Sequence, residues 1–209
     1  MEIIKQLNWR YATKKFDKNK QLSAQDIQQL KEAFNLTATS YGLQPIKLVI
    51  LSNKTLQKEL VAHTFNQPQV EQASHVLVFC IETIIDTKYI ENYFKRLKAV
   101  RNTPEAITNP FKQFLIEDFN KKSKKDIEAW AVKQAYLAMG NLLTVCALRK
   151  IDASPMEGFI SDKFDEVLKL KSKKLKSVLI MPIGYRAEDD MFADFKKVRK
   201  PLSDVIIEL

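Results

Sequence analysis

The sequence predicts an α+β fold, in which helices flank a central mixed sheet of antiparallel type and one long helix is buried in the core. Predicted helices and strands follow each other without the regular βαβ rhythm of a doubly wound sheet. Only four glycines occur in 209 residues, and no two are spaced for a glycine-rich nucleotide loop. The run from about residue 126 to 150 is apolar nearly all round, which is typical of a helix inside a protein.

The first part of the chain is expected to hold three helices and two strands. Ser23 is a predicted N-cap, because apolar residues at helical spacing begin just after it. Gly42 and Pro45 indicate a loop between the second helix and the first strand. In order, the expected elements are a short helix that ends before Asn8, a helix over about 24–34, a strand at Ile46–Leu51, a helix over about 54–63 and a strand over 75–81.

The second part is expected to be mainly helical before it returns to the sheet. Residues 87–122 are helical in texture and rich in charge, so we expect an excursion of one or two helices, broken at Pro104 and Pro110. The long core helix follows, then a helix over about 162–170, a strand over 177–183, a turn at Gly184 and a last strand over 205–208. The length suits one domain over residues 1–209.

The charge and composition favour a soluble protein with an anionic partner. The net charge is +9, with 45% hydrophobic and 28% charged residues. The basic clusters at 14–20, 121–125, 169–176 and 196–200 are spread along the chain, so a nucleic-acid-binding surface is the weaker alternative. The middle two clusters are expected to be solvated faces or loops. The N-terminus has no signal-peptide pattern and the long apolar helix carries Lys133, Gln134 and Asn141, so we expect a cytoplasmic protein without a membrane span.

Side chains with chemistry of their own are few. Cys80 and Cys146 lie in apolar runs and are predicted to be buried, and His63 and His75 lack any nearby partner that would make a nucleophile or metal site. No paired acid and base is present, so no catalytic protein residue and no metal is expected. An enzyme of this composition would take its reactivity from a cofactor.

Two short basic motifs lie near opposite ends of the chain. Arg10 opens the segment Arg10-Tyr-Ala-Thr-Lys14-Lys15-Phe-Asp17, and Arg199 lies in Lys196-Lys197-Val-Arg199-Lys200. Arginine matches phosphate oxygens with a planar fork and needs no glycine loop. The two motifs either meet on one anion, if the fold brings the termini together, or are separate exposed turns.

Six motifs, in order from end to end, resemble the FMN-dependent nitroreductase family, which includes NAD(P)H nitroreductases and dihydropteridine reductases. Each motif is weak alone, and their order makes the resemblance specific. They are Arg10-x-Ala-Thr-Lys14-x-Phe-Asp17, Thr39-Ser40-Tyr41-Gly42-Leu43-Gln44-Pro45, Asn66-Gln67-Pro68-Gln69 with Ala73-Ser74-His75-Val76, Trp130-x-x-Lys133-Gln134-x-Tyr136-Leu137 with Gly140-Asn141, Pro155-Met156-Glu157-Gly158-Phe159, and Lys197-Val198-Arg199.

The resemblance implies a nitroreductase-like fold and a homodimer with two FMN sites in the subunit interface. By position, Arg10, Lys197 and Arg199 would hold the FMN phosphate and Lys14 would lie near the flavin N1/O2 edge. The other implied cofactor-binding positions are Tyr11 and Ala12, Asn66 and Gln69 at the pyrimidine edge, Pro155 and Met156, Glu157 and Gly158 with backbone N–H groups toward N5, and Thr39, Ser40 and Gly42 from the partner subunit. Gly158 is expected at a close approach that needs a permissive φ.

The implied activity is reduction of nitroaromatics, quinones or related flat acceptors by NADH or NADPH, with ping-pong hydride transfer through flavin N5. Tyr41, Phe111, Phe114 and Phe119 are candidates for the acceptor face. Three departures from the family pattern are Ala12 in place of a serine, Gln69 in place of a lysine and Gly42 in place of an asparagine. The Gln69 replacement leaves less positive charge beside the pyrimidine. Related FMN chemistries, namely dehalogenation, flavin destruction and flavin storage, stay open.

Overall fold

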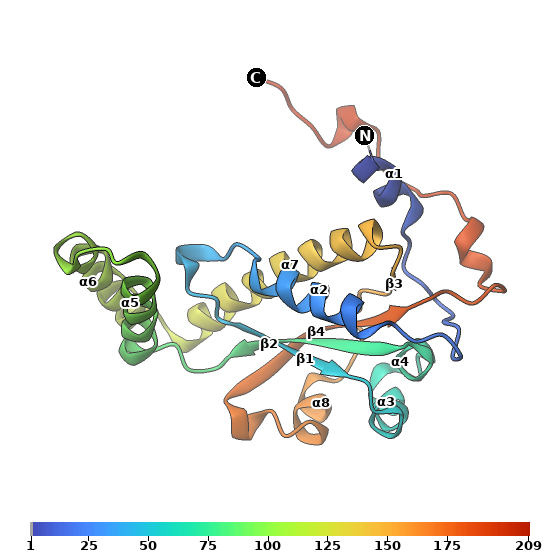
Figure 1. The fold of residues 1–209 in the computed structure, drawn as a ribbon, viewed down its shortest axis with the longest axis horizontal. Coiled ribbons are helices and arrows are strands. Elements are labelled where there is room, and N and C mark those ends of the chain that lie inside the picture. The colour runs from blue at the N-terminus through green and yellow to red at the C-terminus, as the bar shows by residue number, and fades with distance from the viewer. Residues whose placement is uncertain (1) are drawn as a thin grey trace.

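The computed structural model describes residues 2–209 and is built on a four-stranded sheet in the order β1-β2-β4-β3. Each neighbouring pair of strands is antiparallel, which confirms the predicted α+β class (Figure 1). The strands are β1 (Ile46–Leu51), β2 (His75–Glu82), β3 (Asp152–Ala153) and β4 (Leu175–Gly184). The two-residue β3 was not predicted, because a strand so short carries no periodicity.

Strand β2 lies inside the sheet and is buried on both faces, as its run of apolar residues predicts. Leu77, Phe79 and Ile81 belong to the apolar cluster on one face, and Val76 and Val78 belong to the cluster on the other. Successive side chains of a strand point to opposite faces, so one strand supplies both clusters. Cys80 and Cys146 are free and buried, and burial raises the pKa of each thiol to about 12.

Helices cover both faces of the sheet (Figure 1). One face carries α2 (Ala24–Asn35) and the long helix α7, with α1 (Glu2–Trp9) packed on α7, and the other carries α3 (Lys54–Val61), α4 (Gln69–Gln72) and α8 (Ser161–Val167). Ser23 is the N-cap of α2, where its side chain accepts a hydrogen bond from the Asp26 N–H and Asp26 reaches back in a capping box. The predicted start of this helix is therefore confirmed.

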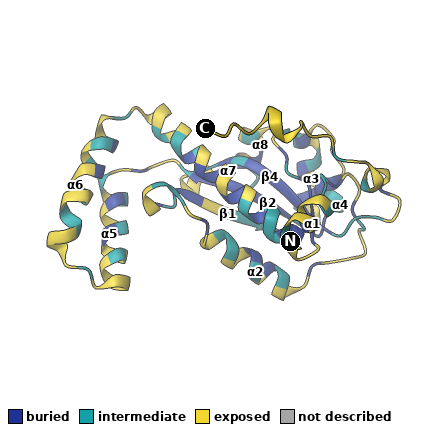
Figure 2. Ribbon diagram, turned by 90° about the horizontal axis from the view of Figure 1, so that it is seen from above, coloured by how far each residue is buried: buried dark blue, intermediate teal, exposed yellow. Residues whose placement is uncertain are grey.

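The segment after β2 forms a hairpin of two helices, α5 (Thr87–Arg101) and α6 (Glu105–Lys121), that extends from the sheet body (Figures 1 and 2). Asn102 ends α5 in the left-handed region at φ 50°. The break predicted at Pro104 is confirmed, whereas the break predicted at Pro110 is wrong, because α6 continues through it. Pro110 lies early in α6, where the missing N–H removes one hydrogen bond that the longer helix tolerates.

Helix α7 (Lys124–Leu148) runs across the sheet and is capped by Ser123. Its buried side is formed by small and apolar residues, including Ala131, Ala135, Ala138 and Leu142. By length and composition alone the helix could span a membrane, but this buried side identifies it as a core helix. The sequence predicted a helix enclosed on all sides. In the structure one side is open, because Tyr136 and Leu137 are exposed.

The strand predicted over 205–208 is wrong for the chain alone. Val205, Ile206 and Ile207 follow a short 3₁₀ turn, η5 (Leu202–Asp204), and are all exposed. A strand needs a neighbouring strand to pair with, and the C-terminal segment runs out into solvent beside α1 (Figure 1). The remaining 3₁₀ turns are η1 (Ser40–Gly42), η2 (Ala62–Thr64), η3 (Lys171–Lys173) and η4 (Met191–Asp194).

Candidate functional site

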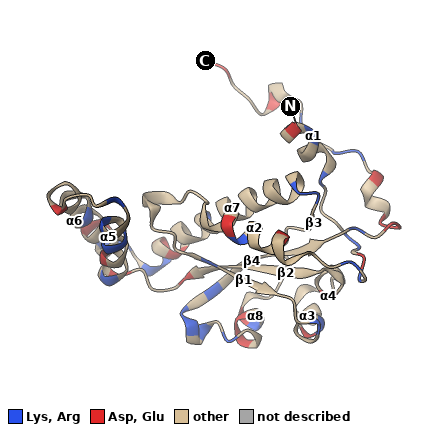
Figure 3. Ribbon diagram, viewed as in Figure 1, with Lys and Arg blue, Asp and Glu red and all other residues tan. Residues whose placement is uncertain are grey.

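Cations from the two ends of the chain meet at one hollow. Figure 3 shows basic residues on the two segments that pass each other beside α1. The hollow has a volume of about 290 Å³ and is lined by Arg10, Tyr11, Ala12, Phe192, Phe195, Lys196, Lys197 and Arg199. The structure thus resolves the alternative that the sequence left open, because Arg10 and Arg199 lie together. We call Arg10, Lys197 and Arg199 the cation cluster.

The cation cluster has no compensating acid. Among residues 2–209, none of its three members forms a salt bridge, and no carboxylate lines the hollow. Burial, and then repulsion from Arg199, lower the pKa of Arg10. Burial, followed by Arg10 and Arg199, lowers the pKa of Lys197. The Arg10 Nε atom is buried without a hydrogen-bond partner. Cations that lie close together without an acid repel each other, and a bound anion removes this repulsion. The residues therefore fit a phosphate group.

Backbone pairing places the Arg10–Lys14 segment against the sheet. Ala12 forms a parallel bridge with Ala153, and the Thr13 N–H donates to the Ala153 carbonyl at 3.4 Å. Because the chain continues from β3 into Ser154–Gly158, the predicted residues Pro155, Met156, Glu157 and Gly158 follow directly from this contact. Met156 is buried and pairs with Ile180 of β4.

The loop after α3 lies against the turn at Gly158. The Gln67 Nε2 donates to the Gly158 carbonyl at 3.1 Å, and the Ile160 N–H donates to the His63 carbonyl at 2.8 Å. These contacts bring Asn66 to the side of Gly158, and Asn66 itself is exposed in the left-handed region at φ 57°. Gln69 is only 4% exposed.

Gly158 does not have the permissive φ that the sequence predicted, since Gly42 is the only glycine in the left-handed region. Glycine is favoured at 158 because the space is tight: a Cβ there would lie 3.2 Å from Gln67 Nε2. Its neighbour Glu157 accepts a hydrogen bond from the Tyr136 hydroxyl at 2.8 Å. In residues 2–209 the backbone N–H groups of Glu157 and Gly158 donate to no other group, so both are available to a ligand.

The loop that carries Thr39, Ser40 and Gly42 lies elsewhere, at the N-terminal part of α7. The Ser40 N–H donates to Gln134 Oε1 at 2.9 Å, and the Thr39 Oγ1 accepts from the Gln44 N–H at 3.0 Å. Tyr41 and Gly42 are both left-handed, at φ 58° and 71°. A non-glycine residue in this region stores strain, and such strain concentrates at functional sites.

Three of the four predicted acceptor-lining aromatics come together around this loop. Tyr41 lies 6.3 Å from Phe111, 6.2 Å from Phe119 and 6.3 Å from Trp130, measured between ring centroids. We call these four side chains the aromatic cluster. Phe114 stacks only on Phe111 and is 54% exposed, so it lies at the rim. Trp130 was part of a motif, yet its place here was missed, because spacing along one helix does not reveal contacts to other segments.

The cation cluster and the aromatic cluster lie at opposite ends of α7. Trp130 is near its start, and Arg10 is close enough to Cys146, near its end, to affect the pKa of that thiol. The stretch from Trp130 to Cys146 spans about 24 Å at about 1.5 Å per residue. Within one chain the two clusters are therefore well separated.

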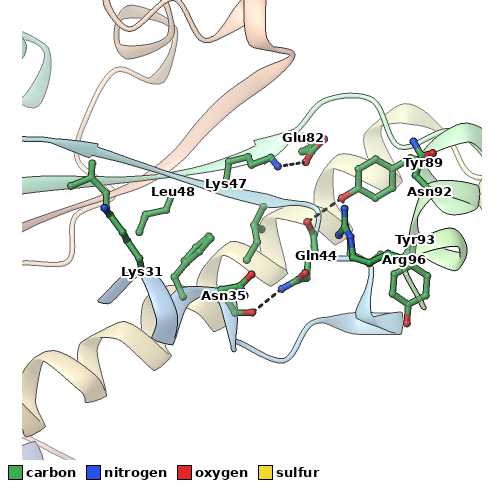
Figure 4. A pocket seen from close by; sticks show the side chains of 14 residues that line it. Lys31, Asn35, Gln44, Lys47, Leu48, Glu82, Tyr89, Asn92, Tyr93 and Arg96 are labelled. Atoms are coloured by element: carbon green, nitrogen blue, oxygen red, sulfur yellow. Dashed lines mark hydrogen bonds and ion pairs between the residues drawn. The ribbon is translucent and has the colours of Figure 1, made fainter. Parts of the chain in front are cut away.

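A larger hollow, which the sequence did not predict, lies along the outer edge of β1 (Figure 4). Its volume is about 590 Å³, and Tyr89 stands at one end, where its hydroxyl lies 2.9 Å from the Leu43 carbonyl and 3.0 Å from the Gln44 carbonyl (Figure 4). Lys47 pairs with Glu82 across its wall. It is lined by polar and apolar residues of α2, the 43–44 loop, β1 and α5 and lies apart from the cation cluster.

A second broad groove, of about 1080 Å³, lies over the exposed side of α7. Its floor is apolar, with Ala129, Val132, Tyr136 and Leu137. We call it the α7 groove. Together with the β1 edge and the C-terminal segment, it leaves apolar surface uncovered that a partner would bury.

Comparison with known proteins identifies the fold and the family. The chain is 32% identical over 216 aligned positions to the oxygen-insensitive NAD(P)H nitroreductase of Enterobacter cloacae and 31% identical over 217 to that of Salmonella typhimurium, covering 100% of each pair.

Solved structures agree. A nitroreductase family protein of Streptococcus pneumoniae superposes with a TM-score of 0.83 at 22% identity, covering 99% of both chains. An Exiguobacterium sibiricum protein assigned as a nitroreductase, in complex with FMN, has a TM-score of 0.83 at 21% identity and covers 100% of this chain and 96% of its own. The family model described as "Nitroreductase family" matches residues 7–185. The chain belongs to the nitroreductase family.

Proposed function

We propose that the protein is an FMN-dependent NAD(P)H oxidoreductase that reduces nitroaromatics, quinones or related flat acceptors with ping-pong kinetics. It acts as a homodimer with the two FMN sites in the subunit interface. The relatives named NAD(P)H nitroreductase and the FMN-bound structural neighbour support this class of activity. The use of NADH or NADPH fits the cytoplasmic location that the sequence predicts.

The cation cluster is the observation that carries the proposal. The cation cluster and Lys196 line one hollow that no acid lines, and the buried Arg10 Nε lacks a partner. Because the chain has no glycine-rich phosphate loop, these side chains supply the charge that a terminal phosphate needs. A monophosphate matches one compact cluster, which favours FMN over a dinucleotide.

The other predicted residues have roles that follow from their places. Lys14 supplies positive charge near the flavin N1/O2 edge, and the free backbone N–H groups of Glu157 and Gly158 face the central ring. Asn66 and Gln69 bind the pyrimidine edge, with Tyr11, Ala12, Pro155 and Met156 around the cofactor. When bound, FMN supplies the hydride carrier at N5. Tyr41 and Phe111 offer aromatic surface to a flat acceptor, and Phe114 extends it.

Assembly of the site requires two subunits. The loop with Thr39, Ser40 and Gly42 lies at the aromatic end of α7, whereas the cations of the same chain lie near its other end, beside Cys146. A single FMN that contacts both sets takes one from each subunit. The α7 groove and the exposed C-terminal residues are the apolar surface available for such an interface.

The test has two parts. Flavin released by acid from purified protein is identified by chromatography, and FMN is expected; FAD, or no flavin after reconstitution, would contradict the proposal. Initial rates are then measured against NADH or NADPH at several fixed menadione concentrations, and parallel double-reciprocal lines are expected. Intersecting lines would show that both substrates bind together. A substrate panel with nitroaromatics and halogenated aromatics separates this reaction from dehalogenation.

A further inference from the structure

Asp190 holds together the two chain segments that supply the cation cluster. It is 4% exposed and receives hydrogen bonds from both sides. Its Oδ2 accepts from the Tyr11 hydroxyl at 2.7 Å, the Lys14 N–H at 2.9 Å and the Lys15 N–H at 3.1 Å. Its Oδ1 accepts from the Phe192 N–H at 3.3 Å, where Asp190 is the N-cap of η4.

The carboxylate is ionised at neutral pH. Burial alone would raise the pKa of Asp190, but the hydrogen bonds from Tyr11, Lys14, Lys15 and Phe192 outweigh it, and the pKa is lowered. One oxygen fixes the Tyr11–Lys15 backbone and the other starts the turn that leads to Lys197 and Arg199. Other side-chain contacts between the two segments include the exposed Lys15–Asp189 ion pair and the Arg186 guanidinium over the Tyr11 ring.

The backbone also joins the two segments upstream of Asp190. The Asp17 N–H donates to the Tyr185 carbonyl at 2.8 Å, and the Ala187 N–H donates to the Lys15 carbonyl at 3.0 Å. These bonds attach the segments to the fold, so loss of Asp190 leaves the sheet intact. They do not reach residues 191–199, whose path back to Arg10 starts at Asp190 and η4.

We infer that Asp190 is the positioning residue of the phosphate site: it sets the distance between Arg10 and the pair Lys197 and Arg199, and thereby selects a phosphorylated flavin over an unphosphorylated one. The inference rests on the proposed function. Asp190 itself is assigned no contact with the flavin. Because it also holds Tyr11 and the Lys14 backbone, a smaller effect is expected at the ring end than at the phosphate end of the ligand.

The test compares FMN with riboflavin, which lacks the phosphate. Affinities of the flavin-free protein for both ligands are measured by quenching of flavin fluorescence in wild type, Asp190→Ala and Asp190→Asn. Asp189→Ala is the matched control, because Asp189 is the adjacent, exposed carboxylate and pairs only with Lys15. Thermal unfolding followed by circular dichroism reports whether each variant folds.

Asp190→Ala is expected to weaken FMN by about 10- to 100-fold, the scale on which supporting hydrogen bonds affect a binding site. Riboflavin affinity is expected to fall by clearly less than FMN affinity, and the affinities of the control are expected to change by less than about twofold. Asp190→Asn keeps one accepting oxygen for Tyr11, Lys14 and Lys15 but presents an amide to the Phe192 N–H, so an intermediate loss of FMN is expected. This variant keeps the inference testable if Asp190→Ala does not fold.

Equal losses of FMN and riboflavin in a folded variant, or no loss of either, would overturn the inference. If wild type binds neither flavin, the proposed function fails. Binding of inorganic phosphate, measured by ³¹P line broadening, then decides the role of Asp190 separately. Weaker phosphate binding in Asp190→Asn than in wild type supports that role, and equal binding overturns it.

Discussion

The two ends of α7 show two different ways to prepare a binding surface. At the C-terminal end, three cations are held together without an acid, and burial together with repulsion lowers the pKa of Arg10 and of Lys197. At the N-terminal end, Tyr41, Phe119 and Trp130 pack on each other with their rings edge-to-face or stacked. One end brings like charges together and gains from a bound anion, whereas the other end packs aromatic rings against each other without a ligand.

The two ends of α7 therefore differ in how far their structure depends on a bound ligand. The aromatic end gains from its own apolar contacts, so it is formed before any ligand arrives. Under the proposed function, a bound phosphate offsets the repulsion among the cations at the other end. Because one chain separates the two ends by about 24 Å, a ligand that needs both has to bring two chains together. The predictions below test that separation.

The largest effect is expected from disrupting the dimer. Leu137 is 55% exposed on the α7 groove, and Leu137→Glu would bury a carboxylate in the proposed interface. The cost of an unpaired buried charge amounts to several kcal/mol, so we expect a monomer and a loss of FMN affinity on the order of 100-fold or more. Light scattering and flavin titration measure the two. Val100→Glu, at an exposed apolar site on α5 outside the α7 groove, is the control. A monomer that retains full FMN would refute the shared site.

Next in size is the loss of one cation. Arg199→Ala is expected to weaken FMN binding by about 2–5 kcal/mol, the cost of breaking a buried charge pair, while riboflavin binding stays unchanged. Calorimetric titration of flavin-free protein measures both. Lys200→Ala serves as control, because Lys200 does not line the hollow. The same FMN affinity in Arg199→Ala and wild type would remove this arginine from the phosphate site.

A smaller and differently distributed effect is expected at the aromatic end. Phe119 is 3% exposed, so Phe119→Ala leaves a cavity and should cost about 3–5 kcal/mol of folding free energy. Phe111 is 43% exposed, so Phe111→Ala should cost under about 1 kcal/mol and should raise the KM for the acceptor with FMN affinity unchanged. Urea unfolding and steady-state kinetics separate the two. Unchanged acceptor kinetics in Phe111→Ala would exclude this ring from the acceptor face.

The smallest effect is a dependence of stability on pH. The pKa of Lys197 is lowered from 10.5 in the folded state, so the unfolded chain binds more protons between the folded pKa and 10.5, and the free energy of unfolding should rise with pH there. Since the side chain is partly exposed, the gain is under about 1 kcal/mol. Urea unfolding of flavin-free protein between about pH 8 and pH 10 should show it. Lys197→Ala and phosphate-saturated wild type should each lack this rise; an equal slope in Lys197→Ala would assign it to other groups.

Local patterns predicted most of the sheet and the helix starts. Strand β1 has the predicted bounds, and Ser23 begins α2 as its capping pattern indicates. The errors at Pro110 and at 205–208 have one physical origin. Whether a helix continues through proline, or an apolar segment pairs as a strand, depends on neighbours that are distant in sequence or lie outside the chain.

The site shows the same division. The sequence motifs predicted the members of the cation cluster. Only the fold shows that these residues line one hollow and that no acidic residue lines it with them. Asp190 lies in a charged run with no motif of its own. Three of its four hydrogen-bond donors, Tyr11, Lys14 and Lys15, lie near the other end of the sequence. Nothing in local spacing could have singled it out.

The left-handed turn at Tyr41 and Gly42 has a consequence for how the family can diverge. At Gly42, φ is 71° and a Cβ would lie 2.8 Å from the Tyr93 hydroxyl oxygen. A larger residue at 42 therefore requires Tyr93 to move or to be replaced, whereas position 93 is free to change while residue 42 is glycine. Along a lineage, a smaller residue at 93 should come before a larger residue at 42. Gly42→Asn should be poorly tolerated in thermal unfolding and restored by adding Tyr93→Ala, and equal stability of the single and double variants would show that the positions evolve independently.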